Sequence, residues 1–175
     1  MVRAIMHGCN GHMGQVITGL IKADEGIELV AGIDKYTGIA NDYPVFESLE
    51  KCDVEADVII DFSNAAAADA LLTYCEEKKM PVVLCTTGLS EEQLAKIPEA
   101  AKKTAVLKSA NMSLGINLLM KLLKEATKVL APAGYDMEIV EKHHNQKLDA
   151  PSGTAISLAD SMNEAMDEAY HYVYD

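Results

Sequence analysis

The residues from Glu141 to Ala155 combine acid, base and anion-binding chemistry in one short stretch, EKHHNQKLDAPSGTA. Two adjacent histidines, His143 and His144, titrate near neutral pH, and Lys147 adds a positive charge shortly after them. The Pro-Ser-Gly-Thr-Ala that follows has the composition of a helix start, whose free backbone N–H groups bind anions. The stretch therefore predicts a site for a small, multiply carboxylated substrate that must be protonated.

A glycine-rich turn near the N-terminus follows a short apolar strand and precedes a helical stretch. Gly8, Gly11 and Gly14 give the spacing GxxGxxG within GCNGHMG. Glycines let a phosphate pair approach the N–H groups of the helix start, so the turn favours a dinucleotide site. This spacing departs from the commoner GxGxxG, and an ordinary tight turn would also explain it.

Asp34 stands at the end of the second predicted strand, where a dinucleotide fold places the carboxylate that binds the adenosine ribose. Lys35 follows it directly and could neutralise a ribose 2′-phosphate. The residues alone therefore leave both NADH and NADPH open as cofactors.

Apolar strands alternate with helical stretches through the N-terminal part of the chain, which predicts a doubly wound parallel sheet of the α/β class. We expect strands at Val2–His7, Glu28–Ile33, Asp57–Phe62, Pro81–Cys85 and Ala105–Lys108, and helices at Met13–Ala23, Ala65–Lys79 and Ser90 to about Lys103.

Ligands bind a parallel sheet at the carboxyl ends of its strands. The segments expected there are Asp61-Phe62-Ser63, Cys85-Thr86-Thr87-Gly88 and Ser109-Ala110-Asn111-Met112. Phe62 would equally suit the core, and Thr86-Thr87-Gly88 would equally suit a plain turn.

The pattern changes after Asn111. Leu114–Leu130 is amphipathic like a long helix, Tyr135–Lys142 alternates like a strand of a different sheet, and Ser152–Ala169 is helical in character. We therefore expect a dinucleotide-binding domain over residues 1–112 and a smaller α+β domain over 113–175.

Composition excludes several classes of function. The chain has 15 basic and 27 acidic residues, a net charge of −12, which disfavours binding to nucleic acid or anionic membranes. It has no apolar run of membrane-spanning length and no signal-like N-terminus, so we expect a cytoplasmic protein. The four cysteines are irregularly spaced, so neither a disulfide framework nor a metal site is expected.

These motifs together resemble the 4-hydroxy-tetrahydrodipicolinate reductase family, also called dihydrodipicolinate reductases, of the diaminopimelate and lysine pathway. The resemblance covers essentially the whole chain and rests on Gly8–Gly14, Asp61-Phe62-Ser63, Thr86-Thr87-Gly88, Asn111–Asn117 and above all Glu141–Ala155. It implies a Rossmann-like domain, and reduction by NADH or NADPH of the heterocycle that the preceding synthase makes. It also implies a homotetramer assembled through the second, substrate-binding domain.

The resemblance also implies roles for individual residues. His143 matches the acid/base histidine, Lys147 the lysine proton donor and His144 a substrate contact. The residues that would hold a substrate carboxylate are Ser152, Gly153 and Thr154. The implied cofactor-binding residues are Gly8, Cys9, Asn10, Gly11, His12, Met13, Asp34, Lys35, Phe62, Cys85, Thr86, Thr87, Ser109, Ala110, Asn111 and Met112.

The chain departs from the family pattern at three of these positions. His12 stands where many members carry arginine, Cys85 where many carry glycine, and Met112 where many carry phenylalanine. The first departure weakens any inference of a strong NADPH preference. Family members also continue well beyond Ala169, so we expect the second domain to be incomplete at its C-terminus.

Two other functions stay open from the sequence. A dehydrogenase acting on an aldehyde would need a nucleophilic cysteine in the second domain, but every cysteine lies at or before Cys85. A non-catalytic nucleotide-binding relative would have no use for His143, Lys147 and the Ser152-Gly153-Thr154 turn together.

Overall fold

The computed structural model describes residues 1–145 and 150–174. It divides the chain into two compact units, Met1–Ser109 (unit 1) and Ala110–Asp175 (unit 2). The sequence places the domain boundary after Met112, close to this division.

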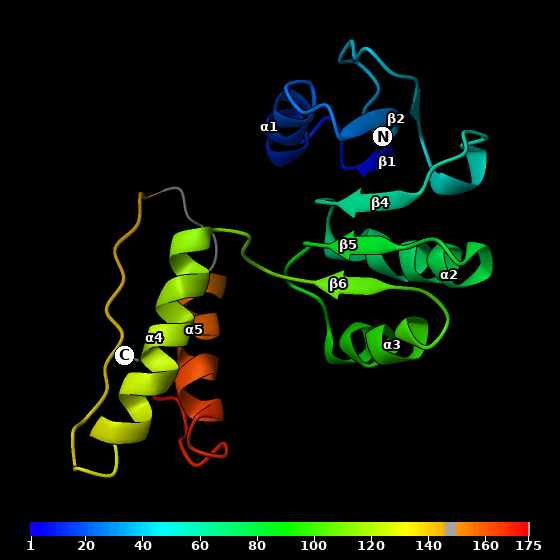
Figure 1. The fold of residues 1–175 in the computed structure, drawn as a ribbon. Coiled ribbons are helices and arrows are strands. Elements are labelled where there is room, and N and C mark those ends of the chain that lie inside the picture. The colour runs from blue at the N-terminus through cyan, green and yellow to red at the C-terminus, as the bar shows by residue number, and fades with distance from the viewer. Residues whose placement is uncertain (146–149, 175) are drawn as a thin grey trace. The chain divides into compact units, whose positions relative to one another are not determined.

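Unit 1 is built on a six-stranded parallel sheet with the strand order β3-β2-β1-β4-β5-β6 (Figure 1). The strands are β1 (Val2–His7), β2 (Ile27–Ile33), β3 (Val45–Phe46), β4 (Val58–Asp61), β5 (Val82–Leu84) and β6 (Val106–Lys108). The helices are α1 (His12–Ile21), α2 (Ala68–Lys78) and α3 (Glu91–Ala101), with short 3₁₀ turns η1 (Leu49–Lys51) and η2 (Ala65–Ala67). This is the Rossmann-like α/β arrangement that the sequence predicts.

The strand order reverses direction at β1. From β1 the chain proceeds outward through β2 and β3, then crosses back to place β4 on the other side of β1. The connections that leave the carboxyl ends of β1 and β4 therefore diverge, and sheets of this kind bind ligands at such a point. In this parallel pair, His7 at the end of β1 is the register partner of Asp61 at the end of β4.

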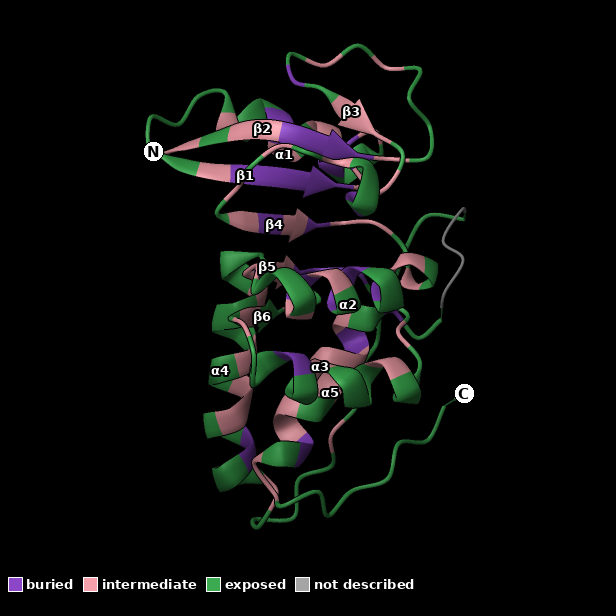
Figure 2. Cartoon of the chain, turned by 90° about the vertical axis from the view of Figure 1, so that its right-hand side faces the viewer, coloured by how far each residue is buried: buried purple, intermediate pink, exposed green. Residues whose placement is uncertain are grey.

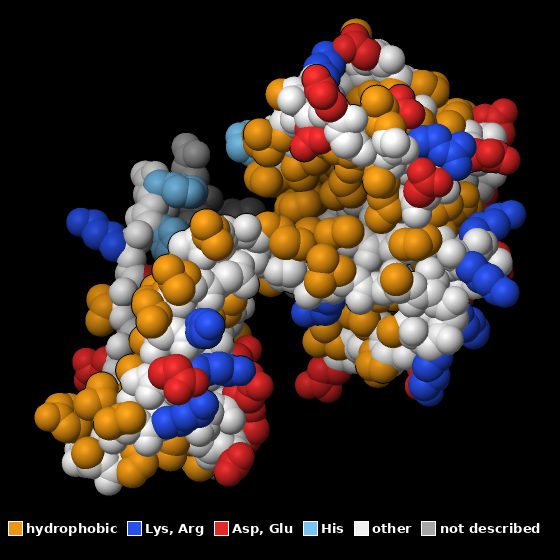
Figure 3. Space-filling view, viewed as in Figure 1, with side chains coloured by type: hydrophobic (Ala, Val, Ile, Leu, Met, Phe, Trp, Pro, Cys, Tyr) orange, Lys and Arg blue, Asp and Glu red, His pale blue; other side chains and the backbone are white. Residues whose placement is uncertain are grey.

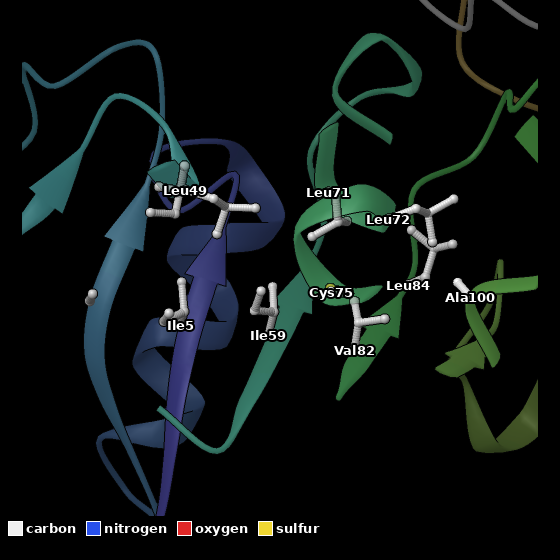
Figure 4. Close-up of a cluster of buried hydrophobic side chains, with 11 residues drawn as sticks. Ile5, Leu49, Ile59, Leu71, Leu72, Cys75, Val82, Leu84 and Ala100 are labelled. Atoms are coloured by element: carbon white, nitrogen blue, oxygen red, sulfur yellow. The ribbon is translucent and has the colours of Figure 1, made fainter. Parts of the chain in front are cut away.

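Apolar side chains alternate between the two faces of the sheet, and each face has its own core. Ile5 and Ile59 point to the face covered by α2 and α3, where they join Leu71 (Figure 4). Met6 and Cys9 belong to the cluster on the other face. Figure 2 shows that burial is concentrated in the carboxyl-terminal halves of β1 and β2. The carboxyl ends of these central strands therefore belong to rigid, packed elements.

Helix α3 shows how local sequence sets an element boundary. The hydroxyl of Ser90 accepts a hydrogen bond from the backbone N–H of Gln93, at 3.2 Å, and the Gln93 side chain accepts one from the N–H of Ser90, at 3.0 Å. This reciprocal capping fixes the helix start that the sequence predicts.

The described part of unit 2 contains two helices, α4 (Leu114–Leu130) and α5 (Gly153–Glu164), which pack against each other. An ion pair between Lys124 and Glu164 joins them on the surface. Helix α4 has the bounds predicted from its amphipathic pattern. Among the described residues, none of these helices or those of unit 1 has the length and apolarity needed to cross a membrane.

The strand predicted at Tyr135–Lys142 is wrong, because the structure assigns this segment neither strand nor helix. A strand is defined by hydrogen bonds to a neighbouring strand, and the described part of unit 2 holds no other strand. The alternation of apolar and polar residues in this segment is therefore not enough to form a strand. Val140, for example, is 91% exposed.

Helix α5 ends earlier than the predicted Ala169. Asp167 and Glu168 have positive φ angles of 53° and 59°, which a continuing helix does not allow. The side-chain amide of Asn163 accepts a hydrogen bond from the N–H of Tyr170 and donates one to its carbonyl, at 2.9 and 3.0 Å. This pair of bonds turns the chain away from the helix axis.

The four cysteines all lie in the described part of the chain and none is bonded to another. Cys9, Cys75 and Cys85 are buried and Cys52 is half-buried. Burial raises the pKa of Cys75 to about 12, which keeps that thiol protonated and unreactive. Within residues 1–145 and 150–174, no three His, Cys, Asp or Glu side chains converge as metal ligands would.

The core on the α2 face should dominate the stability of unit 1. Replacing the fully buried Leu71 by alanine leaves a cavity among Ile5, Ile59 and their neighbours. We expect the free energy of unfolding to fall by about 2–5 kcal/mol, measured by chemical denaturation. The matched control is Leu20→Ala on α1, where the leucine is 66% exposed and the change should be about 0.5 kcal/mol or less. Equal losses for the two variants would contradict this assignment of the core.

Candidate functional site

Two of the three glycines in the loop after β1 are required by the chain's own packing. Gly8 has a φ of +81°, and a Cβ there would lie 2.7 Å from the carbonyl oxygen of Phe62. A Cβ on Gly14 would lie only 2.2 Å from the carbonyl oxygen of Gly8. A Cβ on Gly11 would lie 3.3 Å from the carbonyl oxygen of Gly8, which is a tight contact but not a collision, and this residue is exposed. Gly11 therefore faces solvent, and without a side chain it leaves that space accessible to a ligand.

Helix α1 begins directly at this space and leaves its N-terminal N–H groups for a ligand. Gly11 is the N-cap and supplies no side-chain acceptor, and the first turn contains no acidic residue. His12 and Met13, in that first turn, are exposed, and their N–H groups have no acceptor within the helix. The positive end of the helix dipole points to the same place, so the arrangement fits a pyrophosphate.

Cys9 takes a different place from its neighbours in the loop. Its side chain is fully buried and packs with Met6 and Tyr43. Its carbonyl accepts a hydrogen bond from the side chain of Gln15, at 2.8 Å. Cys9 thus anchors the loop to the core, with its thiol pointing away from the loop surface.

Asp34 fixes the loop after β2 against the glycine loop. Its Oδ2 accepts a hydrogen bond from the backbone N–H of Asn10, and its Oδ1 accepts one from the N–H of Tyr36, both at 3.0 Å. The side-chain amide of Asn10 donates to the carbonyl of Tyr36 and accepts from Asn41, at 2.8 Å. Lys35 is exposed. The carboxylate is therefore held in one orientation while its remaining lone pairs stay available for a ribose hydroxyl.

The contacts of Asn10 show that this predicted cofactor residue has a structural role in the loop. The amide of Asn10 is engaged in holding the 36–41 segment, so it organises the site instead of pointing into it. Asn41, which completes this contact, escaped sequence reasoning because a single asparagine in a loop belongs to no motif.

The other predicted cofactor residues of unit 1 follow the carboxyl ends of neighbouring strands. The backbone N–H groups of Phe62, Cys85 and Ser109 donate to the last residues of the adjacent strands, at 3.0, 2.9 and 3.1 Å. Phe62 and Ser109 are half-buried, Cys85 and Thr86 are buried, and Thr87 is exposed. The parallel sheet thus brings these residues to one edge, as their positions in the sequence predict.

A buried polar cluster underlies this edge. The Asp61 carboxylate is fully buried, and its Oδ1 lies 2.8 Å from Nδ1 of His7 and accepts a hydrogen bond from the Ser63 hydroxyl, at 2.6 Å. The hydroxyls of Ser63 and Thr86 are 3.4 Å apart. Burial raises the pKa of Asp61, but His7 and the hydroxyl donors lower it further, and the net shift is downward. Asp61 is therefore a buried, ionised carboxylate. Sequence reasoning placed Asp61 at a strand end but missed its pairing with His7.

In unit 2, the start of α5 and the histidine segment are tied together by Glu141. The Ser152 hydroxyl caps α5 by accepting a hydrogen bond from the N–H of Ala155, at 3.1 Å. The N–H of Ser152 itself donates to Oε1 of Glu141, at 2.8 Å, and Oε2 of Glu141 lies 3.6 Å from Nδ1 of His143. One carboxylate thus positions both the helix start and the histidine. Glu141 was part of the motif, but its role could not be read from spacing.

The next residues of α5 present groups to solvent. A Cβ on Gly153 would meet no atom within 4 Å, so the glycine is not required by packing. The hydroxyl of Thr154 accepts a hydrogen bond from the side chain of Asn111, at 3.1 Å. The sequence predicts Asn111 as a cofactor-binding residue, whereas in unit 2 it bonds to Thr154 of the predicted substrate motif. Ala110 and Met112, beside it, are exposed.

The remaining residues of the motif differ in what the structure says of them. His143 and His144 are both exposed. Lys147, the predicted proton donor, and Asp149 lie outside the described residues.

The glycine geometry gives a matched pair of substitutions within α1. Gly14→Ala should destabilise unit 1 by about 2 kcal/mol or more and weaken dinucleotide binding, because the new methyl group collides with backbone of the loop. Gly19→Ala, in the same helix with nothing near its Cβ, should stabilise the helix by up to about 1 kcal/mol and leave binding unchanged. Thermal unfolding and NADH titration of both variants provide the measurement. Tolerance of alanine at Gly14 would refute the close approach.

Comparison with known proteins matches both units to one family. Residues 2–112 match the family model described as dihydrodipicolinate reductase, N-terminus, and residues 115–172 match the model described as dihydrodipicolinate reductase, C-terminus.

Curated relatives agree with this match. The chain is 52% identical over 174 residues to the 4-hydroxy-tetrahydrodipicolinate reductase of Caldanaerobacter subterraneus, and 49% identical over 174 residues to that of Clostridium tetani. Each alignment covers 99% of this chain and 68% of the relative.

Solved structures show the same relationship. A dipicolinate-bound dihydrodipicolinate reductase from Paenisporosarcina sp. TG-14 is 30% identical, with a TM-score of 0.77 over 99% of this chain and 69% of that one. The WlbA dehydrogenase from Bordetella pertussis, at 19% identity and a TM-score of 0.56, shares the fold over 71% of this chain and 39% of its own. The chain therefore belongs to the dihydrodipicolinate reductase family, a family of NAD(P)H-dependent oxidoreductases.

Proposed function

We propose that this protein reduces 4-hydroxy-tetrahydrodipicolinate to tetrahydrodipicolinate, in the diaminopimelate route of lysine biosynthesis. The observation that carries the proposal is the Glu141 contact, which joins the histidine segment and the capped start of α5 into one loop. The reaction requires a proton donor and an anion-binding group, and this loop supplies both chemistries. Relatives that carry this reductase name support the same reaction.

The dinucleotide would be held by unit 1. The exposed Gly11 and the N–H groups of His12 and Met13 suit the pyrophosphate, and Asp34 suits the adenosine ribose. The reduced nicotinamide supplies the hydride. The exposed Lys35 is compatible with a ribose 2′-phosphate, so the proposed cofactor is NADH or NADPH.

The substrate would be held by unit 2. The N–H groups of Gly153 and Thr154, at the positive end of α5, suit a carboxylate, and the space at Gly153 lets the ligand approach the backbone. The dicarboxylate dipicolinate is bound in the related Paenisporosarcina enzyme, which supports a dicarboxylate substrate here.

The residues expected to manage the proton are His143 and Lys147. Glu141, 3.6 Å from Nδ1 of His143, can orient the imidazole. Lys147 would add a fixed positive charge that stabilises both the substrate carboxylate and the developing anion.

The proposal includes a cytoplasmic homotetramer assembled through unit 2. Leu114, Leu118 and Leu122 recur at helical spacing on α4, and all three are exposed within the described chain. Apolar side chains are visible on this helix in Figure 3. An exposed apolar stripe of this kind supports assembly through the helix.

The function can be tested with the freshly made product of the preceding synthase and either NADH or NADPH. We expect loss of nicotinamide absorbance, and a fall in rate of about 10²–10⁴-fold in Lys147→Ala and His143→Asn, because each removes a group that supplies or stabilises the proton. The matched control is Lys142→Ala, which removes a neighbouring exposed cation that has no proposed role.

The outcomes separate the candidate functions. Unchanged turnover in Lys147→Ala would contradict the proposed chemistry. NADH binding with no turnover by the unaltered protein would favour a non-catalytic nucleotide-binding relative.

A further inference from the structure

A buried histidine–aspartate pair lies directly beneath the dinucleotide side of unit 1. Asp61 is 0% exposed and His7 is 9% exposed, with Nδ1 of His7 and Oδ1 of Asp61 2.8 Å apart. The two residues are register partners on β1 and β4, the strands at which the sheet order reverses. The next residues along the chain are Gly8 and Phe62, whose backbones form the close approach described above.

The hydrogen bonds that Asp61 accepts come from neutral groups. Apart from His7, they bring no positive charge to compensate the carboxylate. Its Oδ1 accepts from the hydroxyl and the N–H of Ser63, at 2.6 and 3.3 Å. Oδ2 of Asp61 is buried and has no hydrogen-bond partner in the described structure, and the same holds for Nδ1 of His7, so His7 acts on Asp61 through its short distance. Neutral donors orient a carboxylate and stabilise it, but they bring no positive charge.

The other ionisable groups around the pair carry no positive charge either. The thiols of Cys75 and Cys85 face Asp61, and burial raises their pKa values to about 12 and about 11, so both are neutral. The carboxylate of Glu50 faces His7. Among the described ionisable groups around Asp61, His7 is thus the one that can offset the negative charge of its carboxylate.

An uncompensated carboxylate here would oppose the proposed cofactor. The pyrophosphate carries negative charge and would sit on the glycine loop, which begins one residue after His7. Repulsion between like charges is stronger at a partly buried position than in water, because the surroundings screen it less.

We propose that His7 is a positioning residue for the dinucleotide, acting through Asp61. Its imidazole lies 2.8 Å from the carboxylate and, when protonated, compensates that charge, so that the pyrophosphate meets no net negative charge at the carboxyl ends of β1 and β4. Asp61 in turn holds Ser63, whose hydroxyl lies beside Thr86 at the same edge. This inference rests on the proposed function only in needing a dinucleotide on unit 1.

The test is the dissociation constant of NADH, followed by nicotinamide fluorescence, for four forms of the protein. These are the unaltered chain, His7→Asn, Asp61→Asn and the double variant. We expect His7→Asn to weaken binding by about tenfold or more, because it leaves the carboxylate uncompensated. Asp61→Asn should bind NADH at least as tightly as the unaltered chain. The double variant, which has no charge at either position, should recover most of the lost affinity.

Recovery in the double variant separates charge from shape, because a purely structural role would leave the double variant as weak as His7→Asn or weaker. Weak binding by the double variant, or unchanged binding by His7→Asn, would overturn the inference. If His7→Asn fails to fold, as shown by circular dichroism, weaker NADH binding by Asp61→Asn than by the unaltered chain overturns it instead. Failure of the unaltered protein to bind NADH would refute the dinucleotide site of the proposed function, and the inference with it.

Discussion

The close backbone approach at the end of β1 is the constraint on which the dinucleotide side of this protein depends. Gly8 adopts a left-handed conformation against the carbonyl of Phe62, and Gly14 lies against the carbonyl of Gly8. These two contacts turn the chain sharply from the strand into α1, and they set the open helix start at the carboxyl edge of the sheet. Because β1 is central, the ends of β2, β4 and β5 lie at that same edge.

Both units share one physical feature. Each has an accessible helix start whose first N–H groups lack acceptors within the helix, and such helix starts favour anions. In unit 1 the helix start is left uncapped by Gly11, whereas in unit 2 Ser152 caps α5 and Glu141 fastens the cap. A protein with a net charge of −12 can therefore bind anionic ligands through local, short-range positive potential.

Much of this architecture follows from sequence pattern. Five of the six parallel strands and the helices between them were predictable because apolar stretches alternate with helical ones along the chain. Two elements were not foreseen: β3 has only two residues and η1 only three. The predicted strand at Tyr135–Lys142 is wrong because alternation of apolar and polar residues is a property of one segment, whereas a strand also needs a neighbouring strand to pair with. For the site, the glycine loop and the α5 start were predictable from motifs.

The contacts that organise the site were less accessible to sequence. The pairing of His7 with Asp61 depends on the register between two strands far apart in the chain, and the roles of Asn41 and Glu141 depend on how loops close. Such information lies in tertiary structure, since no local pattern encodes which polar groups will meet.

The most direct test of the account is to map the NADH-binding surface of the intact protein by heteronuclear amide NMR. A dinucleotide bound at the glycine loop should cause saturable shifts of the amide signals of Gly11, His12 and Met13 and of residues at the strand ends, including Lys35 and Ser63. Signals at the opposite edge of the sheet, such as those of Val2 and Ile27, should stay unchanged. Saturable shifts confined to that opposite edge, or none at all, would contradict the central claim that the glycine loop and the carboxyl edge of the sheet form the dinucleotide site.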